Sequence, residues 1–332
     1  MGEYEARPDA AGVARFIGYH CSHEQYSPRE LLELAQRAEQ AGFGGAMCSD
    51  HFAPWSKVQG HSGATWPWLG AALQSTRLSF GTVSAPGYRY HPAVLAQSAA
   101  TLSTMYPERL WLALGSGEAL NEHIATTNWP LKEERNERLE RCASAIRRLW
   151  AGEVVTDERI GVFDAQLYDV PETPPLIVAA ALSVKTAEWA GRWADAMVTT
   201  ARDRETMQEI VDAFRRGGGE QKPLFLQAVV SYAGDDETAL DAAYEQWRML
   251  LFGSDTLATL RSPREFDAAA ELVARDVVRE KLRVSSDIEQ HLRWLEGDLA
   301  MGFSRVYMHN VNRETQRDFI ETFGKETQGL TK

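Results

Sequence analysis

The residues in this sequence that are most able to do chemistry are a histidine and a glutamate, each of which follows an apolar segment. His51 lies in "MCSDHFAPW" (47–55) and Glu118 lies in "GSGEALNEH" (115–123). An imidazole and a carboxyl group can act as general base and general acid. Trp55 adds an indole, which can line an apolar ligand pocket. These residue types suit proton transfer to or from a bound ligand, provided that the fold brings them together.

Strand and helix patterns alternate along the chain. This alternation predicts a fold that could bring these residues together. The first helix illustrates the pattern, because Ser27 can cap it, Pro28 suits its first turn and Gly42 can end it. The predicted strands are residues 16–20, 45–49, 78–85, 109–115, 175–181, 195–200, 223–233 and 303–310. This order is typical of a (β/α)8 barrel, with a doubly wound sheet as the structural alternative.

We expect residues 1–332 to form a single α/β domain, a TIM barrel with insertions. Residues 1–15 carry no strand or helix pattern and are predicted to be an N-terminal tail. The segments 152–171 and 252–286 interrupt the alternation of strands and helices and are predicted to be insertions between barrel elements.

The barrel would bring the reactive residues to one end of the molecule. Active sites of (β/α)8 barrels lie at the carboxyl ends of the strands, and both His51 and Glu118 follow predicted strands. Four further side chains on this rim are predicted to form a substrate pocket: His61, Trp66, Arg202 and His309. So many functional side chains on one rim favour a ligand site over separate structural roles.

Two chemistries could use this rim. Metal-dependent hydrolysis would need two imidazoles on one face of the first strand, at i and i+2, whereas His20 and His23 are spaced i and i+3. We therefore expect no metal site. Redox chemistry with a flavin-type ring needs an apolar slot, a proton donor and acceptor, and backbone donors for a phosphate, which the Gly-rich turn 115–117 can supply.

The composition narrows the possible partners. The formal net charge is −12, and an acidic surface repels nucleic acids and anionic membranes. Three cysteines without a CxxC pair fit a reducing cytoplasm, and no apolar run is long enough to span a membrane. We expect a cytoplasmic protein that acts on a small molecule, without a nucleic-acid or membrane partner.

Three segments resemble the luciferase-like monooxygenase superfamily. They are "SDHFAPW" (49–55), "RYHPAVLAQSAATL" (89–102) and "YPERLWLALGSGEALNEH" (106–123). Within the superfamily they look most like the branch that contains the glucose-6-phosphate dehydrogenases dependent on the deazaflavin coenzyme F420. The likeness runs from about residue 16 to residue 324 and implies a (β/α)8 barrel, a flavin or deazaflavin cofactor and a homodimer.

The resemblance implies a role for each matching residue. Asp50 would hold the cofactor ring, His51 would take the hydroxyl proton of an alcohol, and Trp55 would line the substrate side. Glu118 would be a proton donor near the ring, and Asn121 would contact the cofactor.

Two further pairs match less closely. Thr82 and Val83 match a bulged segment of the third strand that backs the ring, one residue short. Where the family has two glycines after the fifth strand, this chain has Ala181 and Leu182. Their side chains would crowd the cofactor tail, so we slightly favour FMN over F420.

The sugar-phosphate enzymes of that branch hold phosphate with three cations. The matching positions here are Asp203, Ala268 and Lys281, so two of the three cations are missing. Burying a phosphate without charge partners is costly. We predict hydride transfer to or from a small organic substrate other than glucose 6-phosphate. The alternatives are an FMN-dependent monooxygenase and a flavin-binding protein with little catalysis.

Overall fold

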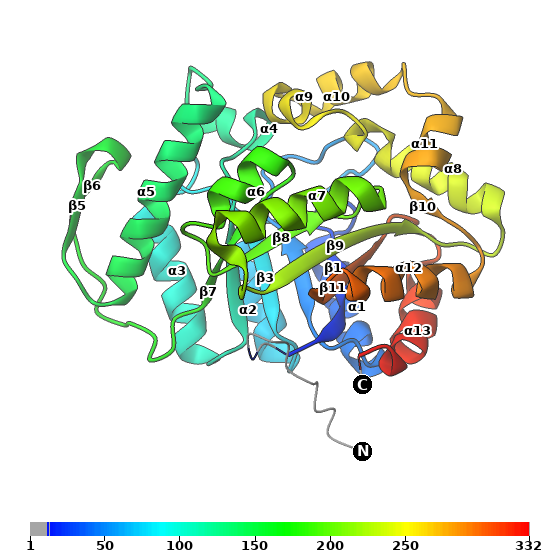
Figure 1. The fold of residues 1–332 in the computed structure, drawn as a ribbon, viewed down its shortest axis with the longest axis horizontal. Coiled ribbons are helices and arrows are strands. Elements are labelled where there is room, and N and C mark those ends of the chain that lie inside the picture. The colour runs from blue at the N-terminus through cyan, green and yellow to red at the C-terminus, as the bar shows by residue number, and fades with distance from the viewer. Residues whose placement is uncertain (1–11, 13, 332) are drawn as a thin grey trace.

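Eight parallel strands close into a barrel in the computed structural model, which describes residue 12 and residues 14–331 (Figure 1). In chain order the barrel strands are β1 (Phe16–Cys21), β2 (Ala46–Ser49), β3 (Phe80–Ser84), β4 (Leu110–Leu114), β7 (Leu176–Ala180), β8 (Ala196–Thr200), β9 (Leu224–Ser231) and β11 (Phe303–Asn310). Pairing of β8 with β9 closes the ring. The (β/α)8 prediction is confirmed over the doubly wound alternative.

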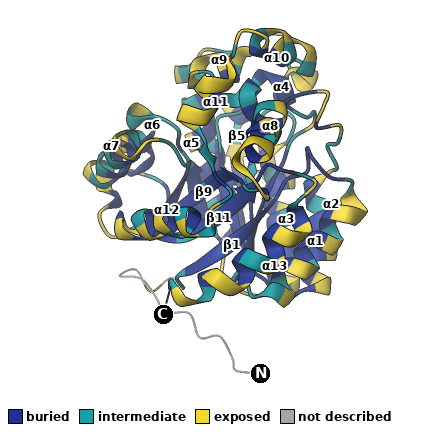
Figure 2. Ribbon diagram, turned by 90° about the vertical axis from the view of Figure 1, so that its right-hand side faces the viewer, coloured by how far each residue is buried: buried dark blue, intermediate teal, exposed yellow. Residues whose placement is uncertain are grey.

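Helices surround the strands, which lie buried at the centre (Figure 2). The surrounding helices are α1 (Pro28–Ala41), α2 (Thr65–Ser75), α3 (Pro92–Met105), α5 (Lys132–Trp150), α6 (Val184–Ala190), α7 (Arg204–Phe214), α8 (Asp236–Trp247), α12 (Ile288–Ala300) and α13 (Gln316–Glu326). The start of α1 follows the expected rules, because Ser27 accepts from the Glu30 backbone N–H and Gly42 ends the helix with φ 106°.

The sequence pattern does not predict α2. Ala64 precedes α2 without a side-chain cap, and Pro67 and Gly70 lie inside the helix. Proline is tolerated in a first turn but glycine weakens a helix interior, so the local pattern is weak. Packing against the barrel stabilises the helix instead, since Trp68, Leu69 and Leu73 are buried in the main core.

Both expected insertions lie between barrel elements. Residues 152–171 contain β5 (Val155–Asp157) and β6 (Val162–Ala165), which pair antiparallel in a separate sheet. Residues 252–286 contain α9 (Ser254–Thr259), α10 (Pro263–Ala270), α11 (Arg275–Lys281) and β10 (Arg283–Val284). In Figure 1, α9 and α10 lie at the same end of the barrel as α4 (Ala119–Glu122). This insertion therefore borders the end at which the site was predicted.

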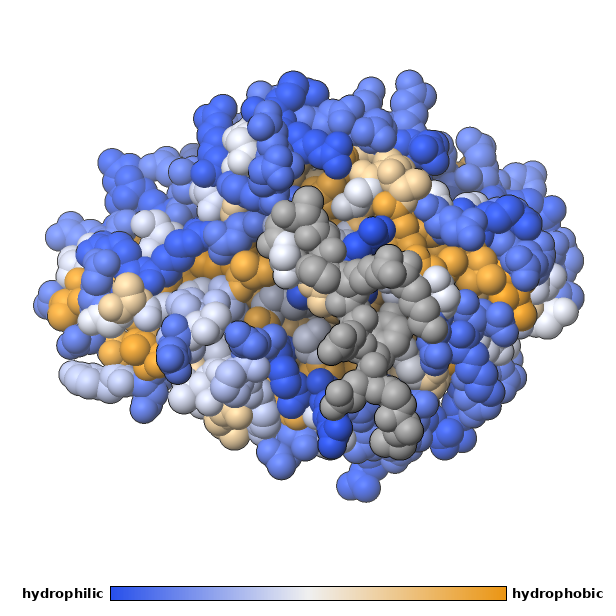
Figure 3. Space-filling model, turned by 60° about the horizontal axis from the view of Figure 1, so that its bottom comes forward, coloured by the Kyte–Doolittle hydropathy of each residue, from blue (hydrophilic) through white to orange (hydrophobic). Residues whose placement is uncertain are grey.

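The predicted tail, residues 1–15, lies outside the described residues except for positions 12, 14 and 15. Figure 3 shows the end of the barrel where β1 begins, with hydrophilic residues over much of its surface and hydrophobic ones between them. None of the helices in the described part of the chain is long and apolar enough to cross a membrane. Over the same residues, no three His, Cys, Asp or Glu side chains gather as a metal site would require.

Strand residues alternate between the barrel interior and the helix layer. An interior cluster contains Phe16, Met47, Trp111, Phe225 and Tyr307. The Trp111 indole N–H donates to the Tyr307 hydroxyl at 3.0 Å. The interior is thus filled by aromatic rings, so the barrel is a packed core and the mouth is where a ligand site is expected.

We predict that Gly81→Ala destabilises the protein by about 1–3 kcal/mol or more, because the added methyl overpacks the interior. A Cβ at Gly81 would lie 1.8 Å from Cε2 of Trp111, which is buried. Urea unfolding measures the change. Gly234→Ala is the matched control, because a Cβ there meets nothing within 4 Å, and equal stability losses in the two variants would contradict the prediction.

Candidate active site

The centre of the candidate site is an ion pair between His51 and Glu24 at the mouth of the barrel. His51 follows β2, and Glu24 lies in the loop after β1. Nδ1 of His51 lies 2.6 Å from Oε1 of Glu24, with 18% and 4% of the two side chains exposed. The contact orients the imidazole and leaves its Nε2 as the nitrogen that can take a proton from a ligand.

Two serines hold the Glu24 carboxylate in place. Its Oε2 accepts hydrogen bonds from Ser22 (2.9 Å) and from Ser49 (2.8 Å). Burial alone would raise the pKa of Glu24, but the charge of His51, the contact with its ring and the hydrogen bond from Ser49 hold that pKa well below its usual range. Burial alone would lower the pKa of His51, and the charge of Glu24 instead raises it above its ordinary value. Glu24 is therefore a stable anion, and His51 is a stronger base than a free imidazole.

Glu118 belongs to the same site. Asn121 connects it to the segment after His51, because Nδ2 donates to Oε2 of Glu118 (3.4 Å) and Oδ1 accepts from the backbone N–H of Phe52 (3.0 Å). Burial raises the pKa of Glu118 to about 6, and the charge of His51 opposes that rise. The carboxyl group can thus carry a proton near neutral pH, as a general acid must. A contact between Asn121 and a cofactor stays a prediction.

Trp55 packs against the base. Its ring meets the His51 ring edge to face, with centroids 4.9 Å apart. On its other side lies Phe266 of α10, at 5.2 Å. The Ser56 hydroxyl donates to Asp267 of the same helix at 2.5 Å. The second insertion therefore holds the Trp55 loop and keeps water from one side of His51.

Asp50 is part of a buried network of charges. Its Oδ1 accepts from the Arg89 guanidinium (3.3 Å) and from the Tyr90 hydroxyl (3.0 Å), and its Oδ2 accepts from Ser84 (2.5 Å). Arg89 also contacts the Glu122 carboxylate, through its backbone N–H at 2.8 Å. The network joins the loops after β2, β3 and β4. Oδ2 of Asp50 can still accept one more hydrogen bond. A hydrogen bond between Asp50 and the cofactor ring stays a prediction.

Small side chains form an apolar surface beside Glu118. A Cβ built on Gly115 would lie 3.9 Å from both Ala180 Cβ and Val83 Cγ1. Val83 packs on the interior cluster, whereas Thr82 is fully buried and faces the helix layer, as the alternation along β3 requires. The strand pairs in unbroken register with β2 and β4. Of the two residues expected to back the ring, only the Val83 side chain lies on the right face, and the expected bulge is absent from the paired residues of β3.

The two residues after β7, Ala181 and Leu182, also lie in different surroundings. Ala181 is fully buried in the core between strands and helices, and its N–H donates to the Val198 carbonyl at 3.0 Å. Leu182 is half-buried. The expectation that both side chains crowd a cofactor tail is wrong for Ala181, which packs toward the helix layer, and remains a prediction for Leu182.

His309 lies inside the barrel, so its expected contact with substrate is wrong. It is 1% exposed. Its Nε2 pairs with Gln25 Oε1 (2.9 Å), and its Nδ1 pairs with Gln227 Nε2 (3.2 Å). Its ring also meets His20 edge to face at 4.3 Å. Burial lowers the pKa of His309 to about 4, so the ring is a neutral, fully paired part of the core.

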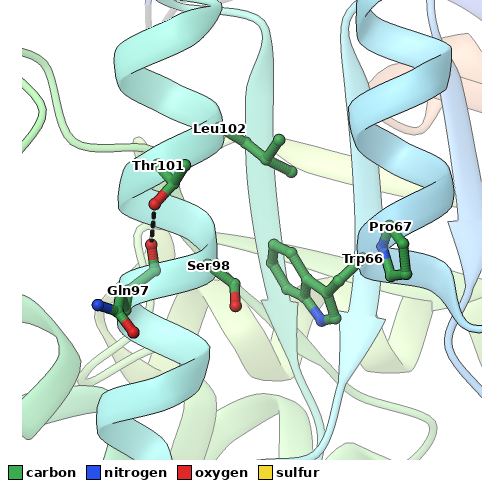
Figure 4. Close-up of a pocket in the computed structure, with 6 residues that line it drawn as sticks. All are labelled: Trp66, Pro67, Gln97, Ser98, Thr101 and Leu102. Carbon is green, nitrogen blue, oxygen red and sulfur yellow. Dashed lines mark hydrogen bonds between the residues drawn. The ribbon is translucent and has the colours of Figure 1, made fainter.

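Trp66 also lies away from the mouth. It is in α2, and its ring lines an outer pocket of about 320 Å³ between α2 and α3 with Leu102 and the side chains in Figure 4. His61 is half-buried near the base, because its backbone N–H donates to the Glu24 carbonyl at 3.0 Å. Arg202 is half-buried in the loop before α7. The roles of His61 and Arg202 in a substrate pocket stay predictions, and that of Trp66 is wrong.

The residues at the mouth fit a flat redox ring. Val83, Gly115 and Ala180 are half-buried and adjoin one another through apolar atoms, which suits one face of an aromatic ring. The charges of His51 and Glu118 shift each other's pKa, so the two groups lie near each other at the mouth. The mouth thus contains small apolar side chains, a possible proton acceptor and a possible proton donor, and their joint role in holding a ring stays a prediction.

A family model for luciferase-like monooxygenases matches residues 13–302. The chain belongs to this family. It is 35% identical over 324 residues to an F420-dependent glucose-6-phosphate dehydrogenase of Beutenbergia cavernae, and the match covers 93% of this chain and 95% of that protein. The family resemblance of the three sequence segments is thus confirmed, and the chain is an oxidoreductase.

Two solved structures illustrate the range of the fold. An F420-dependent secondary alcohol dehydrogenase in complex with an F420-acetone adduct aligns with a TM-score of 0.87 and 28% identity, over 96% of this chain and 99% of that chain. The oxygenating constituent of a Pseudomonas putida diketocamphane monooxygenase in complex with FMN aligns with a TM-score of 0.69 and 16% identity, over 95% of this chain and 98% of that chain. Our preference for FMN gains no support from these comparisons.

Sequence reasoning missed Glu24 and Arg89. Glu24 follows "HCSH" after β1, a segment that we considered only for metal ligands. The signal was an acid in the loop after β1, which neighbours the loop of His51 on the rim. Arg89 lies in one of the segments that carry the family resemblance. Partners that are far apart in the sequence can be recognised only when the barrel places their loops side by side.

We predict that Glu24→Gln shifts the acid limb of the kcat/KM profile to lower pH and reduces the maximum rate. The amide removes the charge that raises the pKa of His51, so the imidazole loses its proton at lower pH and is a weaker base. The profile is measured with saturating cofactor. Ser22→Ala is the control, because it removes one hydrogen bond to Glu24 but no charge. An acid limb that does not move in Glu24→Gln would mean that another group is the base.

Proposed function

We propose that this protein catalyses reversible hydride transfer between a small alcohol and the deazaflavin F420. The Glu24–His51 ion pair carries the proposal, because a buried anion that orients and strengthens an imidazole is what abstraction of a hydroxyl proton requires. The names of the relatives that are 35% and 28% identical to this chain support F420 and alcohol chemistry.

When bound, the cofactor would supply the hydride acceptor. Val83, Gly115 and Ala180 would support its ring, with Asp50 and Asn121 at its edge. The hydroxyl proton of the alcohol would move to Nε2 of His51 as the hydride leaves the carbon.

The remaining residues would control protons and water. Glu24 would stabilise the positive charge that His51 acquires, as an acid behind a catalytic imidazole does. Trp55 would close the substrate side and keep the imidazole in place. Glu118, whose pKa is about 6, would exchange a proton at the edge of the ring.

We propose a substrate other than glucose 6-phosphate, although the curated relatives are named for that sugar phosphate. At the three positions where that branch holds phosphate, Asp203 instead accepts from the Thr206 N–H to cap α7, and Ala268 carries no charge. Lys281 is exposed and lies 3.7 Å from Glu280. These positions do not form the cluster of free cations that a sugar phosphate needs.

We predict that the protein binds F420 in preference to FMN. The test is an absorbance and fluorescence titration of the purified protein with each cofactor, followed by mass analysis of what stays bound. A tighter complex with F420, reduced by alcohols without oxygen, is the expected result. Preferential binding of FMN with oxygen consumption would instead support the flavin monooxygenase alternative.

We predict that His51→Ala lowers turnover of alcohols by about a hundredfold or more and changes the cofactor affinity little, because His51 would act on the substrate proton. Steady-state rates and cofactor titration measure the two effects. His91→Ala is the control, since His91 is an exposed residue that caps α3. Unchanged turnover in His51→Ala would remove this residue from the mechanism.

A further inference from the structure

Two cations beside the turn after β4 have no carboxylate within ion-pair distance in the described part of the chain. Lys132 is the first residue of α5, and Arg135 follows one turn later. Nζ of Lys132 donates to the Ser116 hydroxyl at 2.8 Å, and Nη1 of Arg135 donates to the Gly117 carbonyl at 2.9 Å. Both cations are therefore aimed at the Gly-rich turn that leads into Glu118.

Arg135 is buried without full compensation. Only 4% of the residue is exposed, and its Nε–H, also buried, has no hydrogen-bond partner among the described residues. Its guanidinium lies 4.7 Å from the centre of the Trp129 ring. Buried polar groups are nearly always paired, and a buried charge without a counter-charge is costly. This location therefore lacks a negative group.

The acids around the two cations do not supply that group. Glu133 points to the surface, where it pairs with Lys185 at 3.1 Å. Asp255 of α9 and Glu118 attract both cations, but neither acid forms an ion pair with them among the described residues. Burial lowers the pKa of Lys132 and that of Arg135 despite these acids. The protein itself thus leaves these two cations without a paired carboxylate next to Glu118.

We propose that Lys132 and Arg135, with the turn Gly115–Gly117, bind a phosphate or carboxylate group beside Glu118. Lys132 is half-buried and can reach a ligand directly, while the buried Arg135 supplies a second positive charge. Gly117 adopts φ +80°, and a Cβ on Gly115 would meet no atom closer than 3.9 Å, so an anion can approach this part of the backbone. Charge-assisted hydrogen bonds to the oxyanion would satisfy the cations.

The oxyanion has two possible sources. It can belong to the tail of the cofactor, since both FMN and F420 carry anionic tails, or to an acidic group of the substrate. The chemistry of recognition is the same in both cases. This inference rests on the proposed function, because it assumes that the cofactor ring lies on the surface beside Glu118.

The experiment compares cofactors with and without their tails. FMN is titrated beside riboflavin, and F420 beside its tail-free deazaflavin core, into wild type, Lys132→Met and Lys132→Arg. If the site holds the cofactor tail, Lys132→Met weakens binding of the tail-bearing form by about tenfold, and leaves the tail-free form within about twofold. Lys132→Arg keeps most of the affinity, and the difference shrinks as salt is added.

A second arm detects a substrate oxyanion. Inorganic phosphate is added to protein saturated with the tail-free core, and the rise in Tm is measured. A rise in wild type that Lys132→Met abolishes, with tail-bearing cofactors unaffected, assigns the site to the substrate. Lys185→Met is the control in both arms, because it removes a nearby exposed charge that already has a partner, and it should behave as wild type.

The outcomes separate this inference from the proposed function. If wild type binds the tail-free core, but Lys132→Met changes neither the preference for tails nor the response to phosphate, the oxyanion site is disproved and the hydride-transfer proposal stands. If wild type binds none of the four cofactor forms, the proposed function fails as well. Binding of the tail-free core by Lys132→Met shows that the variant is folded.

Discussion

The contact between Glu24 and His51 is the interaction on which the rest of the site depends. A carboxylate is moved out of water at the end of a barrel, and such a group is stable only if cations and donors replace its hydration. An imidazole and two serine hydroxyls do so here. The same contact gives the imidazole its orientation and its basicity, so folding and reactivity use one interaction.

The surrounding structure connects this contact to the Glu118 carboxyl group. Asn121 ties the segment after His51 to Glu118, and Arg89 ties the loops after β2, β3 and β4 to each other. Each of these bridges is built from charge-assisted or backbone hydrogen bonds in a largely buried position, where such bonds are strong. The loops at the mouth are therefore linked to one another by these hydrogen bonds, and such links favour precise positioning of a substrate.

The sequence was sufficient for the architecture and for part of the site. Nearly continuous apolar strands identified all eight barrel strands, and the rule that strands point their carboxyl ends to one rim placed His51 and Glu118 together. The errors have a common physical cause. His309 and Ala181 are near strand ends, but whether a side chain faces the mouth, the interior or the helix layer depends on the register, which a shift of one residue reverses. Trp66 was misplaced because the weak helix α2 forms only through packing. Glu24 was missed because its partner is distant in the sequence.

The second insertion has a consequence for how such an enzyme can change. Phe266 and Asp267 of α10 hold the loop of Trp55, and Trp55 in turn holds the ring of His51. Substitutions in this insertion that admit a differently shaped molecule would therefore also disturb the imidazole. Substrate selectivity and turnover are therefore coupled through the Trp55 indole. Variants that evolve toward a new specificity would turn over more slowly unless a compensating substitution keeps the indole in place.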